Sequence, residues 1–218
     1  MPDTPAPCLT ATLAELRSRF ADSTPPHPVG DLGFDPRQIE PATLTAAAVL
    51  IPLVLRDSGL TILLTQRTAH LRDHAGQISF PGGRCEETDA SPSATALREA
   101  HEEVGIEAAQ VEILGQLPEY PTATGFTITP VVGLVTPPLN LKLDDFEVAE
   151  VFEAPFEFLM DVGNLQTHAI EFNGQPRQYY AIPWKGYFIW GATAGMLVSL
   201  QRLLHGNAAL AHLPLSDT

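Results

Sequence analysis

The sequence predicts an α/β fold, in which a mixed β-sheet is sandwiched between helices. Short apolar runs of strand length alternate with a few helical stretches, an order typical of such folds. The chain has 218 residues, 44% hydrophobic and 17% charged, so it can bury a core without disulfide or metal staples. We expect a domain over residues 44–206, preceded by a helix and a Pro/Gly-rich linker (1–43) and followed by a tail (207–218).

Periodicity and turn signals place the individual elements. In the first segment, Thr12 and Glu15 form a capping-box pattern at the start of a predicted helix that ends near Phe20. Ser91 as N-cap and Gly105 as terminator bound a second helix. The other predicted elements are strands at 46–55, 60–65, 77–80, 111–117 and 126–135, an acidic helix at 144–152, a hairpin of 167–172 with 178–183, and a last helix at 191–204.

The charge balance excludes several partners. The chain carries 26 acidic and 12 basic residues, for a net charge of -14. Such a surface repels a nucleic-acid backbone and an anionic bilayer, so we expect neither as a partner. The start lacks a signal-peptide pattern, and two cysteines form no disulfide framework, which predicts a cytoplasmic protein. The assembly state stays open, with a homodimer among the alternatives.

Three glutamates share one face of the predicted helix at 91–104. At about 100° per residue, Glu102 and Glu103 lie within roughly 60° of Glu99. The opposite face is expected to pack on the core and consists of Ala94, Leu97, His101 and Val104. Like charges at this spacing destabilise a helix, and a divalent cation would remove the penalty. All-oxygen ligands favour Mg²⁺ or Mn²⁺.

A solvated acidic face is the alternative, and it would be preferred if the three glutamates stood alone. Two neighbouring features favour a metal site. The Pro81-Gly82-Gly83 turn lets backbone carbonyls approach the same pocket, so Gly82 is a candidate metal ligand. Arg98 can hold a carboxylate in a forked pair, and we expect it to orient Glu99.

The stretch from Phe80 to Ile106 resembles the signature of the Nudix hydrolases. Residues 98–106 (REAHEEVGI) match the second half of that pattern throughout. The first half departs twice, because Asp89 stands where the pattern has Glu and eight residues, not seven, separate it from Arg98. The resemblance implies a Nudix-type α/β/α sandwich and a metal-dependent pyrophosphohydrolase, with Glu99, Glu102 and Arg98 in catalytic roles.

A second resemblance points to the coenzyme A pyrophosphatase branch. It lies in residues 63–68 (LLTQRT) and 71–77 (LRDHAGQ), which lead into Phe80-Pro81-Gly82-Gly83, and in later segments up to about Leu197. The branch implies coenzyme A and its thioesters as substrates, with 4′-phosphopantetheine, or its acyl form, and adenosine 3′,5′-bisphosphate as products. NADH, ADP-ribose or another nucleoside diphosphate derivative remains an alternative, as does a non-catalytic nucleotide-binding module.

Basic residues gather around this segment. Arginines bind phosphate oxygens in forked pairs, although any one of them could equally be a surface charge. The candidate substrate-binding residues are Arg67, Arg72, His74, Gln77 and Arg84. A further metal-binding carboxylate is usual in such sites; Glu147 and Glu150 are candidates, and the resemblance favours Glu147. The candidate metal ligands are therefore Glu99, Glu102, Glu103, Gly82 and Glu147.

Overall fold

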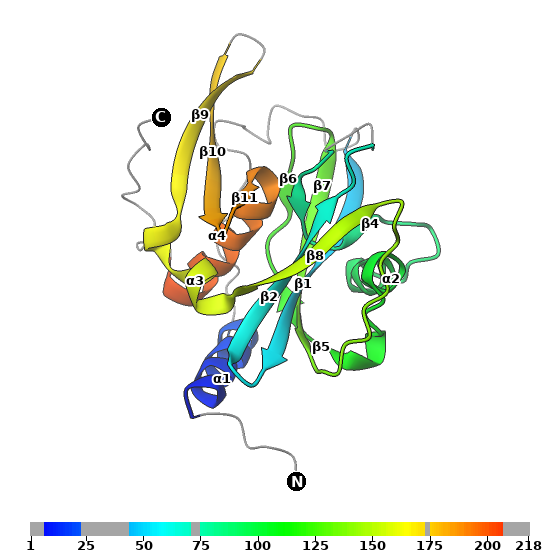
Figure 1. Cartoon of the computed structure of the whole chain (residues 1–218), viewed down its shortest axis with the longest axis vertical. Coiled ribbons are helices and arrows are strands. Elements are labelled where there is room, and N and C mark those ends of the chain that lie inside the picture. Colours follow the sequence, from blue (N-terminus) through cyan, green and yellow to red (C-terminus); the bar gives the residue numbers. More distant parts are fainter. Residues whose placement is uncertain (1–6, 23–43, 71–74, 173–174, 207–218) are drawn as a thin grey trace.

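The computed structural model describes residues 7–22, 44–70, 75–172 and 175–206. Its centre is a mixed sheet in which β1 (Thr45–Arg56) pairs antiparallel with β2 (Gly59–Arg67) and parallel with β7 (Phe126–Val135) (Figure 1). Both faces of β1 are buried along most of its length, as its apolar run predicts. The remaining strands of this sheet are β3 (Ile78–Ser79), β4 (Gly82–Arg84), β5 (Val111–Gln116), β6 (Tyr120–Pro121) and β8 (Val148–Pro155). The predicted mixed α/β fold is confirmed.

A second sheet has three antiparallel strands, β9 (Gln166–Phe172), β10 (Gln175–Trp184) and β11 (Tyr187–Trp190). The predicted hairpin corresponds to β9 and β10, and its turn at 173–174 lies outside the described residues. Strand β11 was not predicted. Its signal is the pair Lys185–Gly186, whose φ angles of 45° and 90° suit a two-residue hairpin turn between Trp184 and Tyr187.

Helices cover both faces of the large sheet (Figure 1). Helix α2 (Pro92–Val104) packs against β1 on one face. On the other face lie α1 (Pro7–Ala21), α3 (Phe156–Met160) and α4 (Gly191–His205). Short 3-10 turns span Ala108–Gln110 and Val162–Asn164. The result is an α/β/α arrangement.

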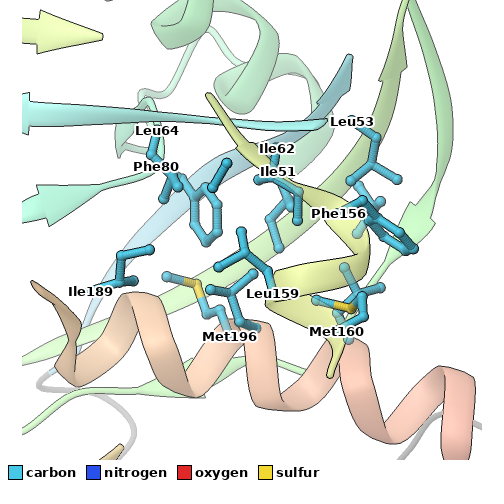
Figure 2. Packing of buried hydrophobic residues seen from close by; sticks show 14 of the residues in the cluster. Ile51, Leu53, Ile62, Leu64, Phe80, Phe156, Leu159, Met160, Ile189 and Met196 are labelled. Carbon is cyan, nitrogen blue, oxygen red and sulfur yellow. The ribbon is translucent and has the colours of Figure 1, made fainter. Parts of the chain in front are cut away.

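Two hydrophobic clusters correspond to these two faces. On the α2 side, Ala48, Leu50 and Val54 of β1 pack with Ala96 and Ala100 of the helix. On the other side, the cluster includes Ile51, Leu53, Ile62, Leu64, Phe80, Phe156, Leu159, Met160, Ile189 and Met196, as Figure 2 shows. Alternate residues of β1 therefore serve opposite cores, which fixes the strand's register.

Three local predictions were wrong. The acidic helix at 144–152 is a turn followed by β8: the Asp144 carbonyl accepts the amides of Glu147 and Val148, and the chain then pairs with β2. Helix α1 begins at Pro7, so Thr12 lies inside it and not at its N-cap. Gly82 and Gly83, expected to lie in a turn, form β4 with Arg84 and pair with β1. Tertiary pairing decides the first and third cases.

Within the described residues, no helix is both long enough and apolar enough to cross a membrane.

Candidate active site

Helix α2 is the element that places the glutamates, and local signals define its ends as predicted. The Ser91 side chain accepts a hydrogen bond from the Ala94 amide at 3.2 Å, which caps the N-terminus. Gly105 follows the last turn with φ 75°, a left-handed conformation that favours glycine. Between these ends, Ala96 and Ala100 are buried against the sheet. The small residues bring the helix close to β1 and to the neighbouring β4.

The helix is rotated relative to the predicted core face. Its buried side runs through Ala96, Ala100, Glu103 and Val104, so it overlaps the acidic face instead of lying opposite to it. His101, predicted to pack on the core, is exposed, and its Nε2 lies 3.2 Å from a Glu107 carboxylate oxygen. The rotation makes room for Glu99 and Glu103 at the junction between the helix and β4, and it leaves Glu102 facing solvent.

Glu103 and Glu99 both contact β4, the short strand that begins with Gly82 and Gly83. Glu103 is 5% exposed, and one of its oxygens accepts the Gly82 amide at 3.2 Å. Glu99 lies against Gly83 so closely that a Cβ on Gly83 would stand 2.5 Å from the Glu99 carboxyl carbon. The absence of a side chain at Gly83 therefore provides the space for the Glu99 carboxylate.

Arg98 connects this pair to the loop before the helix. Its Nη1 donates to Glu99 at 2.8 Å and to Glu102 at 3.0 Å. Its Nε and Nη2 donate to the two oxygens of Asp89 at 3.1 and 2.9 Å, and Nη2 also donates to the Arg84 carbonyl at 3.1 Å. These five contacts equal the five N–H groups of a guanidinium, so Arg98 has no donor left for a phosphate. The contact between Arg98 and Glu99 that this role requires is present.

Asp89 explains how this sequence tolerates its departure from the general pattern. The carboxylate receives Arg98 in a two-pronged pair and also accepts the Glu86 amide at 2.9 Å and the Thr95 hydroxyl at 2.9 Å. The hydrogen bonds from Arg98, followed by the one from the Glu86 amide, hold the pKa of Asp89 far below its usual range. The shorter side chain thus still reaches Arg98, and these hydrogen bonds favour its ionised form.

Glu147 approaches the same carboxylates from another element. It lies in the turn before β8, where its carbonyl accepts the Thr68 amide at 3.0 Å and its carboxylate is 3.7 Å from Arg67. Burial is the main cause that raises the pKa of Glu99 and Glu103, and the negative charge of Glu147 adds to both shifts. The structure therefore brings Glu147 to the site. Glu150 instead accepts the Tyr187 hydroxyl at 2.6 Å.

The predicted substrate-binding arginines do not all lie at the site. Arg67 remains at the site, beside Glu147, and its amide donates to the Gln77 carbonyl at 2.9 Å, which places Gln77 next to it. Arg84 follows Gly83 on β4, so strand alternation turns its side chain to the other face, where the guanidinium lies 5.4 Å from the Phe126 ring centroid. Arg72 and His74 lie outside the described residues.

The donor set matches a hard divalent cation. Among the described residues, no group of three or more His, Cys, Asp or Glu side chains is positioned to hold a metal ion as it stands, and Arg98 engages Glu99 and Glu102. The nearby oxygens nevertheless suit Mg²⁺ or Mn²⁺. Burial raises the pKa of Glu103 to about 8, and a bound cation would stabilise its ionised form.

Comparison with known proteins agrees with this geometry. A model of the NUDIX domain matches residues 44–172. The chain is 44% identical over 161 residues to the uncharacterized Nudix hydrolase NudL of Shigella flexneri, covering 74% of this chain and 83% of the relative. NudL of Escherichia coli K12 is 45% identical over 154 residues, covering 71% and 80% of the two chains.

Among solved structures, the Nudix hydrolase RenU of M. smegmatis aligns with a TM-score of 0.51 at 20% identity, covering 80% of this chain and 90% of that one. This likeness concerns the fold alone. The domain match and the identity to the NudL proteins show more than a shared fold, and the packing of α2 and its glutamates against β4 agrees with them. This chain belongs to the Nudix hydrolase family.

Proposed function

We propose that the chain is a Mg²⁺- or Mn²⁺-dependent pyrophosphohydrolase that cleaves the diphosphate of coenzyme A and its thioesters. The products would be 4′-phosphopantetheine, or its acyl form, and adenosine 3′,5′-bisphosphate. One observation carries the hydrolytic part of the proposal: Glu99 and Glu103 lie against the Gly82–Gly83 backbone, and the charge of Glu147, which stands beside Arg67, acts on both carboxylates. Support for coenzyme A comes from the sequence segments around residues 63–77.

The residues would divide the work as follows. Glu99, Glu103 and Glu147, with the Gly82 carbonyl and Glu102 at the edge, would hold the cation, which when bound neutralises charge on the diphosphate and acidifies a water molecule. Arg98 keeps Glu99 in place and Arg67 offers its guanidinium to a phosphate oxygen. Glu102, whose side chain is 57% exposed, is the candidate base that takes the proton of the attacking water.

A substrate panel tests the proposal. With Mg²⁺ present, kcat/KM is measured for coenzyme A, dephospho-coenzyme A, NADH and ADP-ribose. Coenzyme A carries a 3′-phosphate that the other three lack. One charge-assisted contact to that group would favour coenzyme A over dephospho-coenzyme A roughly tenfold to a hundredfold. A higher kcat/KM for NADH or ADP-ribose than for coenzyme A would replace the substrate assignment.

Two arginine substitutions refine the test. Arg67→Ala should lower kcat/KM for all four substrates alike, since Arg67 stands beside the carboxylates that would face the shared diphosphate. Arg84→Ala is the matched control, because its side chain points to the other face of the sheet. Arg72→Ala should abolish the preference for coenzyme A over dephospho-coenzyme A if Arg72 binds the 3′-phosphate.

A further inference from the structure

The aromatic side chain that directly precedes Glu147 in the chain has no role in the chemistry above. Phe146 is 63% exposed, the most exposed of the large hydrophobic side chains in the described part of the chain. Its ring centroid lies 4.9 Å from that of His70, with the two planes at 60°. A single exposed apolar side chain is common on protein surfaces, so exposure is only the starting point.

The backbone at Phe146 is held from both sides. Its amide donates to the Asp144 side chain at 2.9 Å, and its carbonyl accepts the Thr68 hydroxyl at 2.8 Å. The following peptide is fixed as well, because the Thr68 amide donates to the Glu147 carbonyl at 3.0 Å. Thr68 itself is buried. The chain therefore presents the exposed ring from a well-anchored turn, whereas an incidental surface side chain needs no such support.

The position of the ring relative to the charges matters most. Phe146 directly precedes Glu147, whose charge acts on Glu99 and Glu103, and His70 lies three residues after Arg67 on the neighbouring segment. The two rings are thus carried by the same two segments that hold Arg67 and Glu147 beside each other. In an adenine nucleotide the base is joined to the phosphates through a single ribose.

We infer that Phe146 and His70 form a stacking platform for the purine base of the substrate. Nucleobases stack on aromatic side chains through their flat π-faces, and this contact needs no matching hydrogen bonds. The inference rests on the proposed nucleotide substrate, but it does not require that the substrate be coenzyme A, because the alternatives NADH and ADP-ribose also carry adenine.

Direct binding tests the platform without turnover. Phe146→Trp places a fluorophore at the ring position, and AMP is added in the presence of Mg²⁺. We expect saturable quenching by AMP and by adenosine 3′,5′-bisphosphate, and none by ribose 5-phosphate or 4′-phosphopantetheine. Ile113→Trp is the control: Ile113 is 36% exposed on β5, which β7 separates from β1. Its emission should not respond to AMP.

The second measurement is inhibition of the enzyme without the tryptophan substitution. Phe146→Ala should raise the inhibition constant of AMP about tenfold and leave that of ribose 5-phosphate unchanged. Phe146→Tyr keeps an aromatic ring, so its inhibition constant for AMP should stay at the wild-type value. Equal changes for AMP and ribose 5-phosphate would overturn the platform, as would quenching by 4′-phosphopantetheine alone. Cleavage of coenzyme A without any AMP effect refutes only the platform. AMP quenching with no cleavage of coenzyme A supports the platform and refutes the substrate.

Discussion

At the scale of single residues, Glu103 is the side chain on which stability and activity make opposite demands. It is 5% exposed, and its carboxylate accepts a hydrogen bond from the Gly82 amide. Burial is the main cause that raises its pKa to about 8, against an ordinary value of 4.5. The folded protein without metal therefore prefers a neutral Glu103, whereas a metal ligand must be ionised.

This preference makes the stability of the metal-free protein depend on pH. Between about pH 4.5 and 8 the unfolded chain releases the Glu103 proton and the folded chain keeps it, so stability falls as pH rises through this window. Glu103→Gln cannot ionise. In EDTA its Tm, relative to wild type, should be similar at pH 4.5 and several degrees higher at pH 8.

Glu102→Gln serves as the control, because Glu102 is 57% exposed and its substitution should shift Tm about equally at both pH values. A Glu103→Gln protein whose Tm difference from wild type is the same at pH 4.5 and 8 would contradict the burial argument.

Activity should respond in the opposite direction. Glu103→Gln and Glu99→Gln each keep the size of the side chain and remove a negative charge. Each should lower kcat at least about 10²-fold at saturating Mg²⁺, the scale of a lost electrostatic contact in a transition state. Turnover near the wild-type value in both variants would eliminate the assignment of these two residues.

At the scale of elements, β4 combines two glycines that differ in what surrounds them. A Cβ at Gly82 would lie 2.5 Å from the Ala48 carbonyl oxygen and 2.6 Å from the Val49 Cα, both backbone atoms of β1. A Cβ at Gly83 would meet only the end of the Glu99 side chain among its nearest atoms. Gly82 allows β4 to pair closely with β1, and Gly83 leaves space for the Glu99 carboxylate.

Alanine substitutions should separate these roles. Gly83→Ala displaces the flexible Glu99 carboxylate, so we expect kcat to fall about 10- to 100-fold with little change in Tm. Gly82→Ala forces backbone atoms apart and should lower Tm by several degrees. Thermal melts and steady-state kinetics on the two purified variants distinguish the outcomes, and a reversed pattern would show that the two glycines have been assigned the wrong way round.

Helix α2 shows which parts of the site the sequence can predict. Its ends depend on Ser91 and Gly105, and its glutamates on helical spacing, which are all local in the chain. The prediction of which side of the helix faces the sheet was wrong. Ala96 and Ala100 determine that side by packing on β1, and helical periodicity alone cannot detect that partner. His101 was misplaced for the same reason.

Contacts between segments that are distant in the chain were harder to predict from the sequence. Residues 144–152 contain enough acidic and apolar residues to suggest a helix, but pairing of 148–155 with β2 makes them a strand. That pairing, with the Thr68 contacts, is what brings Glu147 beside Arg67. Three of the four hydrogen bonds that fix Asp89 likewise join a loop to a helix, and the fourth comes from Glu86 within the loop. The motif alone indicated only that this position departs from the general pattern.

At the scale of the whole molecule, α1 attaches to the side of the sheet that faces away from α2. Leu16 is 1% exposed in the large hydrophobic cluster, and the Phe20 ring lies against Gly115 of β5. Arg17 donates to both oxygens of Glu112 at 3.0 and 2.7 Å. The helix is therefore part of the packed domain, although it precedes the stretch matched by the family model.

Removing its main anchor should cost stability and spare the chemistry. Leu16→Ala should lower the free energy of unfolding by about 2–4 kcal/mol, the range for buried leucines. The kcat measured well below the melting transition should stay close to the wild-type value, since the sheet separates Leu16 from Glu99. Chemical denaturation and kinetics at low temperature check both statements, and an equal loss of kcat would link α1 to the site.

The five occupied donors of Arg98 have a consequence for how the molecule opens. One side chain ties together the β4 backbone, the loop at Asp89 and two positions of α2. Segments linked in this way tend to unfold locally as one cooperative unit, so their amide hydrogens should exchange with deuterium at a common rate. Arg98→Lys, with three donors at most, should divide this unit, and the loop at 85–90 should then exchange well before the helix.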